Sequence, residues 1–434
     1  MKTRGNPLAM ALASILSAGS AAAQSAEPSN TAANTAEENA ELEAIVGETV
    51  AEEAEPSRFS VYGFMDVGLQ RISSITPSLG VALPSEETSF ISGNNNLYLE
   101  VRPDANWRGL IETRLSLLPH GDYKFQGLGV SERTDTRIID ATSPSGRNNV
   151  ELGGIVVERA FLEWMYNDYL NVRAGRFFTP WGIWNVDHGT PTLIALMMPS
   201  FLVQEAIPQR QTGVQLFGRH NAPPWQLTYD LTISNGRTDT LFDTTDGKAI
   251  GSRIVLRRQG ELGIAAGTSM YHGDYQDERK TLSITPNQDV QLSKETIVAY
   301  DESSVGADLS LDYRGWRLRA EAMVRKVEHD TGKRRALTYR PNQPQVPDRI
   351  EYYGYAILAY RFMNYFEPYT FYERLETNKR ADVVEAGYSL SGGVNIYFTP
   401  AVQLKMQYAH SSFENFLPDR NTTNFWVSRL VMAF

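Results

Sequence analysis

The sequence predicts an all-β protein, a transmembrane antiparallel β-barrel of sixteen strands. Two observations carry this prediction. Segments of alternating apolar and polar residues recur from Arg58 to the last residue, and the connections between them are alternately short and long. A period of two is the pattern of strands with one apolar and one polar face. In a barrel that crosses a membrane, the apolar face meets lipid and the polar face lines the interior.

The segment 225–235 shows the alternation most clearly, since Trp225, Leu227 and Leu231 alternate with Gln226 and Thr228. Fifteen further segments follow the same rule, and an even number of strands closes such a barrel with both chain ends on one side. The predicted strands are 58–72, 95–103, 107–117, 155–166, 169–178, 209–219, 225–235, 249–258, 261–272, 303–313, 315–328, 349–362, 364–375, 383–398, 400–412 and 422–434.

The connections support the same architecture. Tight turns such as 103–106 and 259–260 alternate with longer connections such as 118–154 and 179–208. Membrane barrels have short turns on the periplasmic side and long loops on the external side. A soluble β-sandwich is the alternative, but it needs no such strict alternation.

The last strand alternates up to the carboxyl-terminal residue, with Met432 and Phe434 on one face and Arg429 on the other. A terminal strand that ends on Phe434 resembles the assembly signal of bacterial outer-membrane β-barrels. We therefore expect the β-barrel assembly machinery to be a partner. Outer-membrane lipid and lipopolysaccharide are the expected surroundings of the outer face.

The amino terminus predicts export. Lys2 and Arg4 precede an apolar run and an Ala21-Ala22-Ala23 site, so residues 1–23 are interpreted as a cleaved signal peptide and the location as the Gram-negative outer membrane. Residues 24–56 form an acidic periplasmic leader, either disordered or a short helix. The barrel is expected over 57–434.

Composition excludes some classes of site. The chain has no cysteine, which excludes disulfides, thiolate metal sites and a Cys nucleophile. The net charge of −10 is concentrated at the amino terminus, because residues 1–56 hold nine Glu and two basic residues, leaving 39 basic and 42 acidic residues for 57–434. The overall charge therefore gives no guide to the solute.

A barrel of sixteen strands is wide enough for an aqueous channel. The connection 179–208 is too apolar to be left in water, so we predict that this third external loop folds into the lumen and constricts it. Its candidate constriction residues are Trp181, Trp184, Asp187 and His188. His188 either contacts the solute, responds to pH or is simply solvated.

The sequence around this loop resembles a known family. Residues 172–182 read V-R-A-G-R-F-F-T-P-W-G and residues 208–218 read P-Q-R-Q-T-G-V-Q-L-F-G. These stretches look like the G-R-F…P-[FW]-G and R-x-x-G-V-Q-x-x-G stretches of the phosphate-selective porin O/P-like family. The DcaP-type trimeric outer-membrane porins for dicarboxylates are similar in outline. The resemblance implies a sixteen-stranded homotrimer whose third loop folds inward, and it carries over no particular solute.

Basic residues on the polar faces must point inward, because charges on the lipid face near the midplane cost a few kcal/mol each. Two interpretations stay open: they attract small anions such as phosphate or carboxylates, or they pair with inward acids such as Glu112 and Glu163 and stiffen the wall. We expect wall pairing for most and a modest anion preference. The candidate pore-lining residues are Arg114, Arg159, Arg173, Arg210, Arg253, Arg317, Arg319, Arg325 and Lys405.

No enzyme motif is present, since neither G-x-S-x-G nor H-E-x-x-H occurs in the chain. We expect no enzymatic activity, no cofactor, no metal and no nucleic-acid partner. The predicted function is a porin, a passive diffusion channel for small hydrophilic solutes. The alternative is a non-conducting or plugged barrel that acts as an adhesin or an outer-membrane enzyme.

Overall fold

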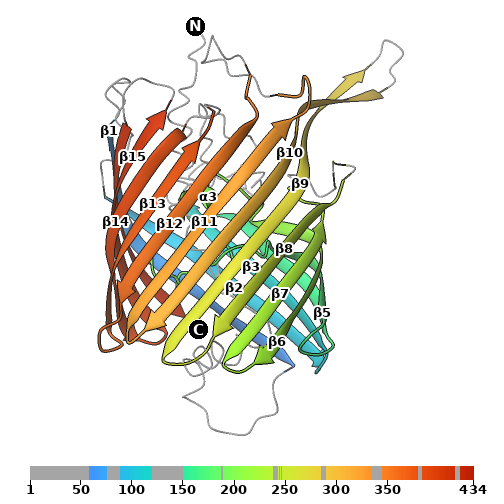
Figure 1. Ribbon diagram of the computed structural model, residues 1–434. Coiled ribbons are helices and arrows are strands. Elements are labelled where there is room, and N and C mark those ends of the chain that lie inside the picture. The colour runs from blue at the N-terminus through green and yellow to red at the C-terminus, as the bar shows by residue number, and fades with distance from the viewer. Residues whose placement is uncertain are drawn as a thin grey trace.

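The computed structural model shows a closed antiparallel barrel in which each strand pairs with its sequence neighbours and β1 pairs with β16 (Figure 1). The residues that the structure describes are 58–75, 88–119, 150–186, 189–237, 243, 245, 247–284, 290–334, 345–379, 384–415 and 421–434. The predicted signal peptide and the acidic leader lie outside these residues.

The sixteen strands are β1 (Phe59–Ile75), β2 (Ser89–Asp104), β3 (Trp107–Pro119), β4 (Val150–Met165), β5 (Asn171–Phe178), β6 (Arg210–Ala222), β7 (Trp225–Ser234), β8 (Ala249–Arg258), β9 (Leu262–Ile284), β10 (Val290–Tyr313), β11 (Trp316–His329), β12 (Arg349–Tyr360), β13 (Phe366–Thr377), β14 (Val384–Thr399), β15 (Val402–Asn415) and β16 (Asn421–Ala433). The helix α3 (Ser200–Val203) lies between β5 and β6. In the described part of the chain, no helix is long and apolar enough to cross a bilayer.

The barrel is closed by pairing between its first strand, β1, and its last strand, β16. Val67 lies opposite Leu430, and the backbone N–H and C=O of Gly63 both bond to Phe434 at 2.9 Å. The predicted fold class and strand number are confirmed, and the terminal strand is the partner of the first. The tight turns gather at the lower rim in Figure 1.

Exposed apolar side chains are frequent on the outer face, whereas the buried charged side chains point inward. Val305, Leu231 and Leu390 are exposed on the outside, while Glu112 and Arg159 are fully buried within. Lipid is the solvent of the outer face, so this division is the one that the membrane dictates.

One predicted connection was wrong. Residues 273–302 were expected as a loop, but most of them extend β9 and β10, which form a hairpin that projects beyond the upper rim (Figure 1). The rings of Tyr275 and Tyr300 stack across this hairpin with centroids 4.9 Å apart. Beyond the lipid both faces of a strand meet water, so the apolar alternation that identifies the membrane strands is not required there.

Candidate functional site

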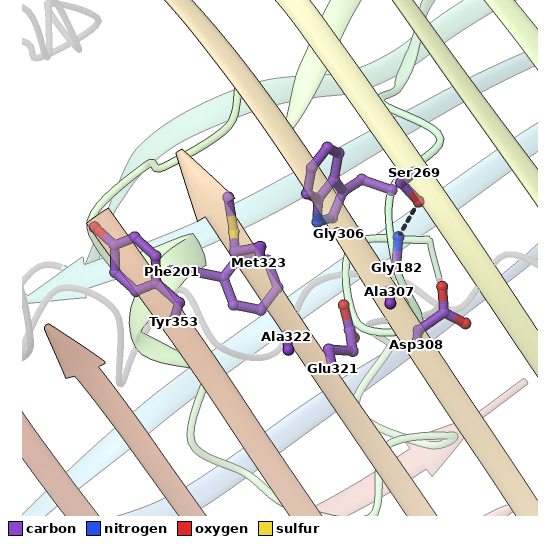
Figure 2. Close-up of a pocket in the computed structure, with 11 residues that line it drawn as sticks. Gly182, Phe201, Ser269, Gly306, Ala307, Asp308, Glu321, Ala322, Met323 and Tyr353 are labelled. Atoms are coloured by element: carbon purple, nitrogen blue, oxygen red, sulfur yellow. Dashed lines mark hydrogen bonds between the residues drawn. The ribbon is translucent and has the colours of Figure 1, made fainter. Parts of the chain in front are cut away.

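The connection between β5 and β6 starts by crossing to β11. Glu321 of β11 accepts the backbone N–H groups of Ile183 and Trp184 at 2.9 and 2.7 Å, and the hydroxyl of Tyr355 at 2.5 Å. The N–H of Gly182 donates to Ser269 at 3.2 Å (Figure 2). Backbone N–H groups inside a barrel need hydrogen-bond acceptors. Here one carboxylate is the acceptor for the N–H groups of two consecutive residues.

Two glycines make this first turn of the connection possible. Gly182 has φ +56°, and a Cβ there would lie 1.8 Å from the Glu321 carboxylate. Gly306 of β10 leaves room for the ring of Trp181, because a Cβ at 306 would lie 2.7 Å from that ring. Figure 2 shows Gly182, Gly306 and Glu321 around the same tight pocket. A larger residue at either glycine would displace the connection from the wall.

The rest of the connection is bound to the inner wall by side chains from several other strands. Gln407 of β15 accepts the N–H groups of Leu196 and Met197 at 2.7 and 3.0 Å, and Glu373 of β13 accepts the N–H of Ser200 at 2.7 Å. Further contacts join Thr190 to Asp66, Leu193 to Lys405, Ile194 to Asn395 and Gln204 to Tyr353. These partners lie on β1, β12, β14 and β15.

Apolar packing accompanies these hydrogen bonds. The ring of Trp184 lies edge-on to Tyr355 at 6.1 Å and stacked on Phe371 at 6.2 Å, and Phe201 stacks on Tyr355 at 6.4 Å. Burying a large apolar side chain stabilises by roughly 1.5–3 kcal/mol. The β5–β6 connection therefore packs on the aromatic inner faces of β12 and β13. Of its predicted constriction residues, Asp187 and His188 lie outside the described residues.

The predicted pore-lining bases on β4 and β5 are paired with acids. Arg173 contacts Glu163 at 2.8 Å and donates to Gln215 at 3.1 Å. Its guanidinium also lies over the rings of Phe161 and Phe217, at 4.3 and 5.0 Å from their centroids. Only 9 % of the Arg173 side chain is exposed, so it is held within the wall.

A β-bulge in β4 brings three arginines and two acids together on the inner wall. The register shifts between Glu112 and Thr113, so the consecutive residues Glu158 and Arg159 are both fully buried. Arg159 contacts Glu112 at 2.6 Å. Glu158 in turn contacts both Arg114 of β3, at 3.1 Å, and Arg210 of β6. A strict alternation would have put 158 and 159 on opposite faces.

Arg325 joins two acids towards the upper end of the wall. It contacts Glu302 of β10 at 2.6 Å and Glu351 of β12 at 3.0 Å, and only 6 % of its side chain is exposed. Arg237 also contacts Glu302 at 2.9 Å, and Arg349 contacts Glu351 at 2.5 Å. These three basic side chains therefore form one continuous ionic network with two carboxylates.

Comparison with known sequences identifies the family. The sequence profile described as "Phosphate-selective porin O and P" matches residues 140–434. The chain belongs to this family. It is thus an outer-membrane β-barrel porin. Among curated proteins, no sequence matches the chain significantly.

Solved structures share the fold of this porin. An anion-selective porin from Comamonas acidovorans has TM-score 0.52 and 10 % identity, covering 87 % of this chain and 99 % of that one. The outer membrane channel DcaP of Acinetobacter baumannii has TM-score 0.50 and 12 % identity, covering 87 % and 97 %. A loop L8 deletion mutant of OmpT from Vibrio cholerae has TM-score 0.50 and 10 % identity, covering 86 % and 100 %.

Near the tight-turn rim of this porin, three arginines surround two carboxylates. Arg317 contacts Glu367 at 2.8 Å and Arg319 contacts Asp312 at 3.0 Å. Arg361 lies 3.8 Å from Glu367. Their side chains are 23, 17 and 31 % exposed, well above the values for Arg173 and Arg325.

The two remaining predicted bases differ in their surroundings. Arg253 contacts Asp308 at 3.0 Å and is 11 % exposed. Lys405 is fully buried, and its ammonium donates to the carbonyl of Leu193 in the β5–β6 connection. The structure thus brings Lys405 to the connection, whereas Arg253 lies on the wall.

Sequence reasoning missed the side chains that hold the connection in this porin. It expected the inward acids to pair with neighbouring arginines, and it gave no role in holding the connection to Glu321, Glu373, Gln407 or Gly306. An acid that accepts N–H groups of a connection and an acid that pairs with a base both occupy inward positions of strands. The sequence therefore contained no signal that separates the two.

Proposed function

We propose that this porin is a passive diffusion channel for small hydrophilic solutes with a modest preference for anions such as phosphate or carboxylates. The β5–β6 connection, with Trp181 and Trp184, forms its constriction and sets the size limit. Asp187 and His188 of the same connection complete the proposed constriction. Diffusion through such a channel needs neither a cofactor nor an energy source.

The observation that carries the anion preference is the arginine cluster at the tight-turn rim, Arg317, Arg319 and Arg361. Its charge exceeds that of the two carboxylates it contacts, and one of these, Glu367, is fully buried. The guanidinium of Arg361 lies 4.3 Å over the ring of Tyr397, which fixes its direction. Fixed guanidiniums with partly accessible edges attract carboxylate and phosphate groups.

We assign the other predicted basic residues to two roles according to how exposed their side chains are. Arg114, Arg210 and Arg253, each between 11 and 14 % exposed, are assigned to solute contact together with the cluster at the rim. The more deeply buried bases instead stiffen the wall or hold the connection. These are Arg159, Arg173, Arg325 and Lys405.

The biological setting belongs to the same proposal. Residues 1–23 direct export, residues 24–56 lie on the periplasmic side, and the Phe434 strand is read by the β-barrel assembly machinery. The barrel works as a homotrimer in contact with outer-membrane lipid and lipopolysaccharide. The family membership supports this setting.

Planar-bilayer recording of the purified protein under a salt gradient tests the proposal. We expect discrete current steps and a reversal potential shifted toward the anion side. Replacing Arg317, Arg319 and Arg361 together by Gln should reduce this shift. The control is Arg374→Gln, which removes an exposed arginine that pairs with Glu376 on the outer side of β13.

A cation-shifted reversal potential would contradict the anion preference, and so would an unchanged shift in the triple variant. Absence of steps would contradict the channel function. It would favour the second candidate, a plugged barrel that serves as an adhesin or enzyme. The observation in favour of that candidate is the number of strands, from β1 to β15, that bind the β5–β6 connection.

A further inference from the structure

Among the residues that the structure describes, the buried acids on the inner wall fall into two groups. Nine of them form an ion pair with an arginine. Glu321 and Glu373 do not: within the described residues, no lysine or arginine lies within 4.0 Å of either carboxylate. Both residues are nevertheless buried, since only 7 % of Glu321 and 9 % of Glu373 is exposed. A buried carboxylate without a basic partner needs other hydrogen-bond donors.

The donors come from the β5–β6 connection. Glu321 accepts the N–H groups of Ile183 and Trp184, and Glu373 accepts the N–H of Ser200. The two carboxylates thus bind the first turn of the connection and the start of α3. The charged groups near Glu321 are Asp308 and Arg253, and the neutral phenol of Tyr355 donates a hydrogen bond to it.

We propose that Glu321 and Glu373 are positioning residues of the channel, which hold the β5–β6 connection against the wall and thereby set the width of the pore. This inference rests on the proposed constriction role of that connection. It names two attachments whose loss loosens the parts of the connection that they hold, while the sixteen-stranded wall stays closed.

The chemistry explains why carboxylates serve here. A connection without a ladder partner leaves its N–H groups unsatisfied, and a carboxyl oxygen can accept hydrogen bonds from several of them at once. An arginine beside Glu321 would compete for the Oε1 atom that accepts the N–H groups of Ile183 and Trp184 and the hydroxyl of Tyr355.

Each carboxylate is replaced in two ways. Glu321→Gln and Glu373→Gln keep an acceptor oxygen and the side-chain size, whereas Glu321→Leu and Glu373→Leu remove every acceptor. Glu376→Leu on the outer side of β13 is the matched control, because it removes an exposed acid that does not contact the connection. Gel mobility with and without heating verifies that each barrel is closed.

The first measurement is single-channel conductance. The Leu variants should show larger and noisier steps than the wild type, while the Gln variants and Glu376→Leu should stay near the wild-type value. If the wild type conducts and the Leu variants conduct identically, the inference is overturned.

The second measurement does not depend on conduction. Because the natural chain has no cysteine, Ile183→Cys and Ser200→Cys provide single thiols on the connection. Combined with the Leu variant of its own anchor, each thiol should react about tenfold faster or more with a water-soluble thiol reagent, as expected when the hydrogen bonds to that anchor are lost. The Gln variants should restore a slow reaction.

The outcomes separate the two proposals. A wild type without current contradicts the proposed function, while the thiol rates still test the anchors. Equal rates in the Leu variants and the wild type overturn the inference, whatever the conductance. If Glu321→Leu does not fold, Glu373→Leu with Ser200→Cys supplies the same test at the other anchor.

Discussion

Asp66 and Arg429 form a buried ion pair, 3.1 Å apart, between the first and last strands of the barrel. The residues are 363 positions apart in sequence and meet only because the barrel closes. The same carboxylate accepts the hydroxyl of Thr190 at 3.1 Å, so it also links the closing strands to the β5–β6 connection.

Loss of this pair should destabilise barrel closure. Arg429→Met removes a base that pairs with the buried Asp66 carboxylate, which should lower the free energy of unfolding by about 3 kcal/mol. Urea titration in lipid vesicles, followed by tryptophan fluorescence, measures the change. The double variant Asp66→Asn/Arg429→Met should recover part of the loss, because it removes the buried charge together with its partner. A double variant less stable than Arg429→Met would contradict this account.

Filling the space beneath Trp181 should displace the β5–β6 connection. Gly306→Val puts a branched side chain where a single Cβ would already lie 2.7 Å from the indole ring. Overpacking of this kind costs about 1–3 kcal/mol, so we expect lower stability together with altered conductance. Gly392→Val is the matched strand control, because no heavy atom lies within 4 Å of a Cβ at that position. Equal effects of both substitutions would argue against the Trp181 contact.

Arg173 should support the wall without contributing to selectivity. Arg173→Met leaves Glu163 with only the distant Arg108, 4.0 Å away, and should cost about 3 kcal/mol of stability. The reversal potential under a salt gradient should stay at the wild-type value, because Arg173 is enclosed between Phe161 and Phe217. A large change in reversal potential without loss of stability would assign Arg173 to solute contact instead.

The connection after β11 should stay attached in acid. The Arg334 guanidinium lowers the pKa of the Asp348 carboxyl from 3.8 to about 2, and the backbone N–H of His329 adds to this shift. A carboxyl with a lowered pKa stabilises the folded state at every pH above its pKa in the unfolded chain. This contribution is lost as the pH falls through about 2, the pKa of Asp348 in the folded protein.

Hydrogen exchange of the His329 amide, which donates to Asp348 at 2.8 Å, reports this attachment. In the wild type its protection should persist to about pH 3, whereas in Arg334→Gln it should decline from about pH 4. Identical pH profiles for the two proteins would show that Arg334 does not set the pKa of Asp348.

Ion pairs between neighbouring strands could be predicted from the sequence only in part. The inward direction of Arg159 and Arg325 followed from alternation, because lipid excludes charge from the outer face. Their burial did not follow, since it depends on which acid lies on the neighbouring strand. Glu158 shows the limit most clearly: the bulge that turns it inward beside Arg159 interrupts the alternation itself.

The sequence by itself determined the sixteen strands, their order and the closing strand that ends at Phe434. Lipid on one face imposes a period of two, and that pattern is local in the chain. Only the tertiary structure decided that Glu321 binds Ile183 from a distance of 138 positions, and that Arg317 keeps an accessible edge whereas Arg173 does not. Such contacts depend on register and on the path of one connection across the lumen, and neither leaves a local pattern.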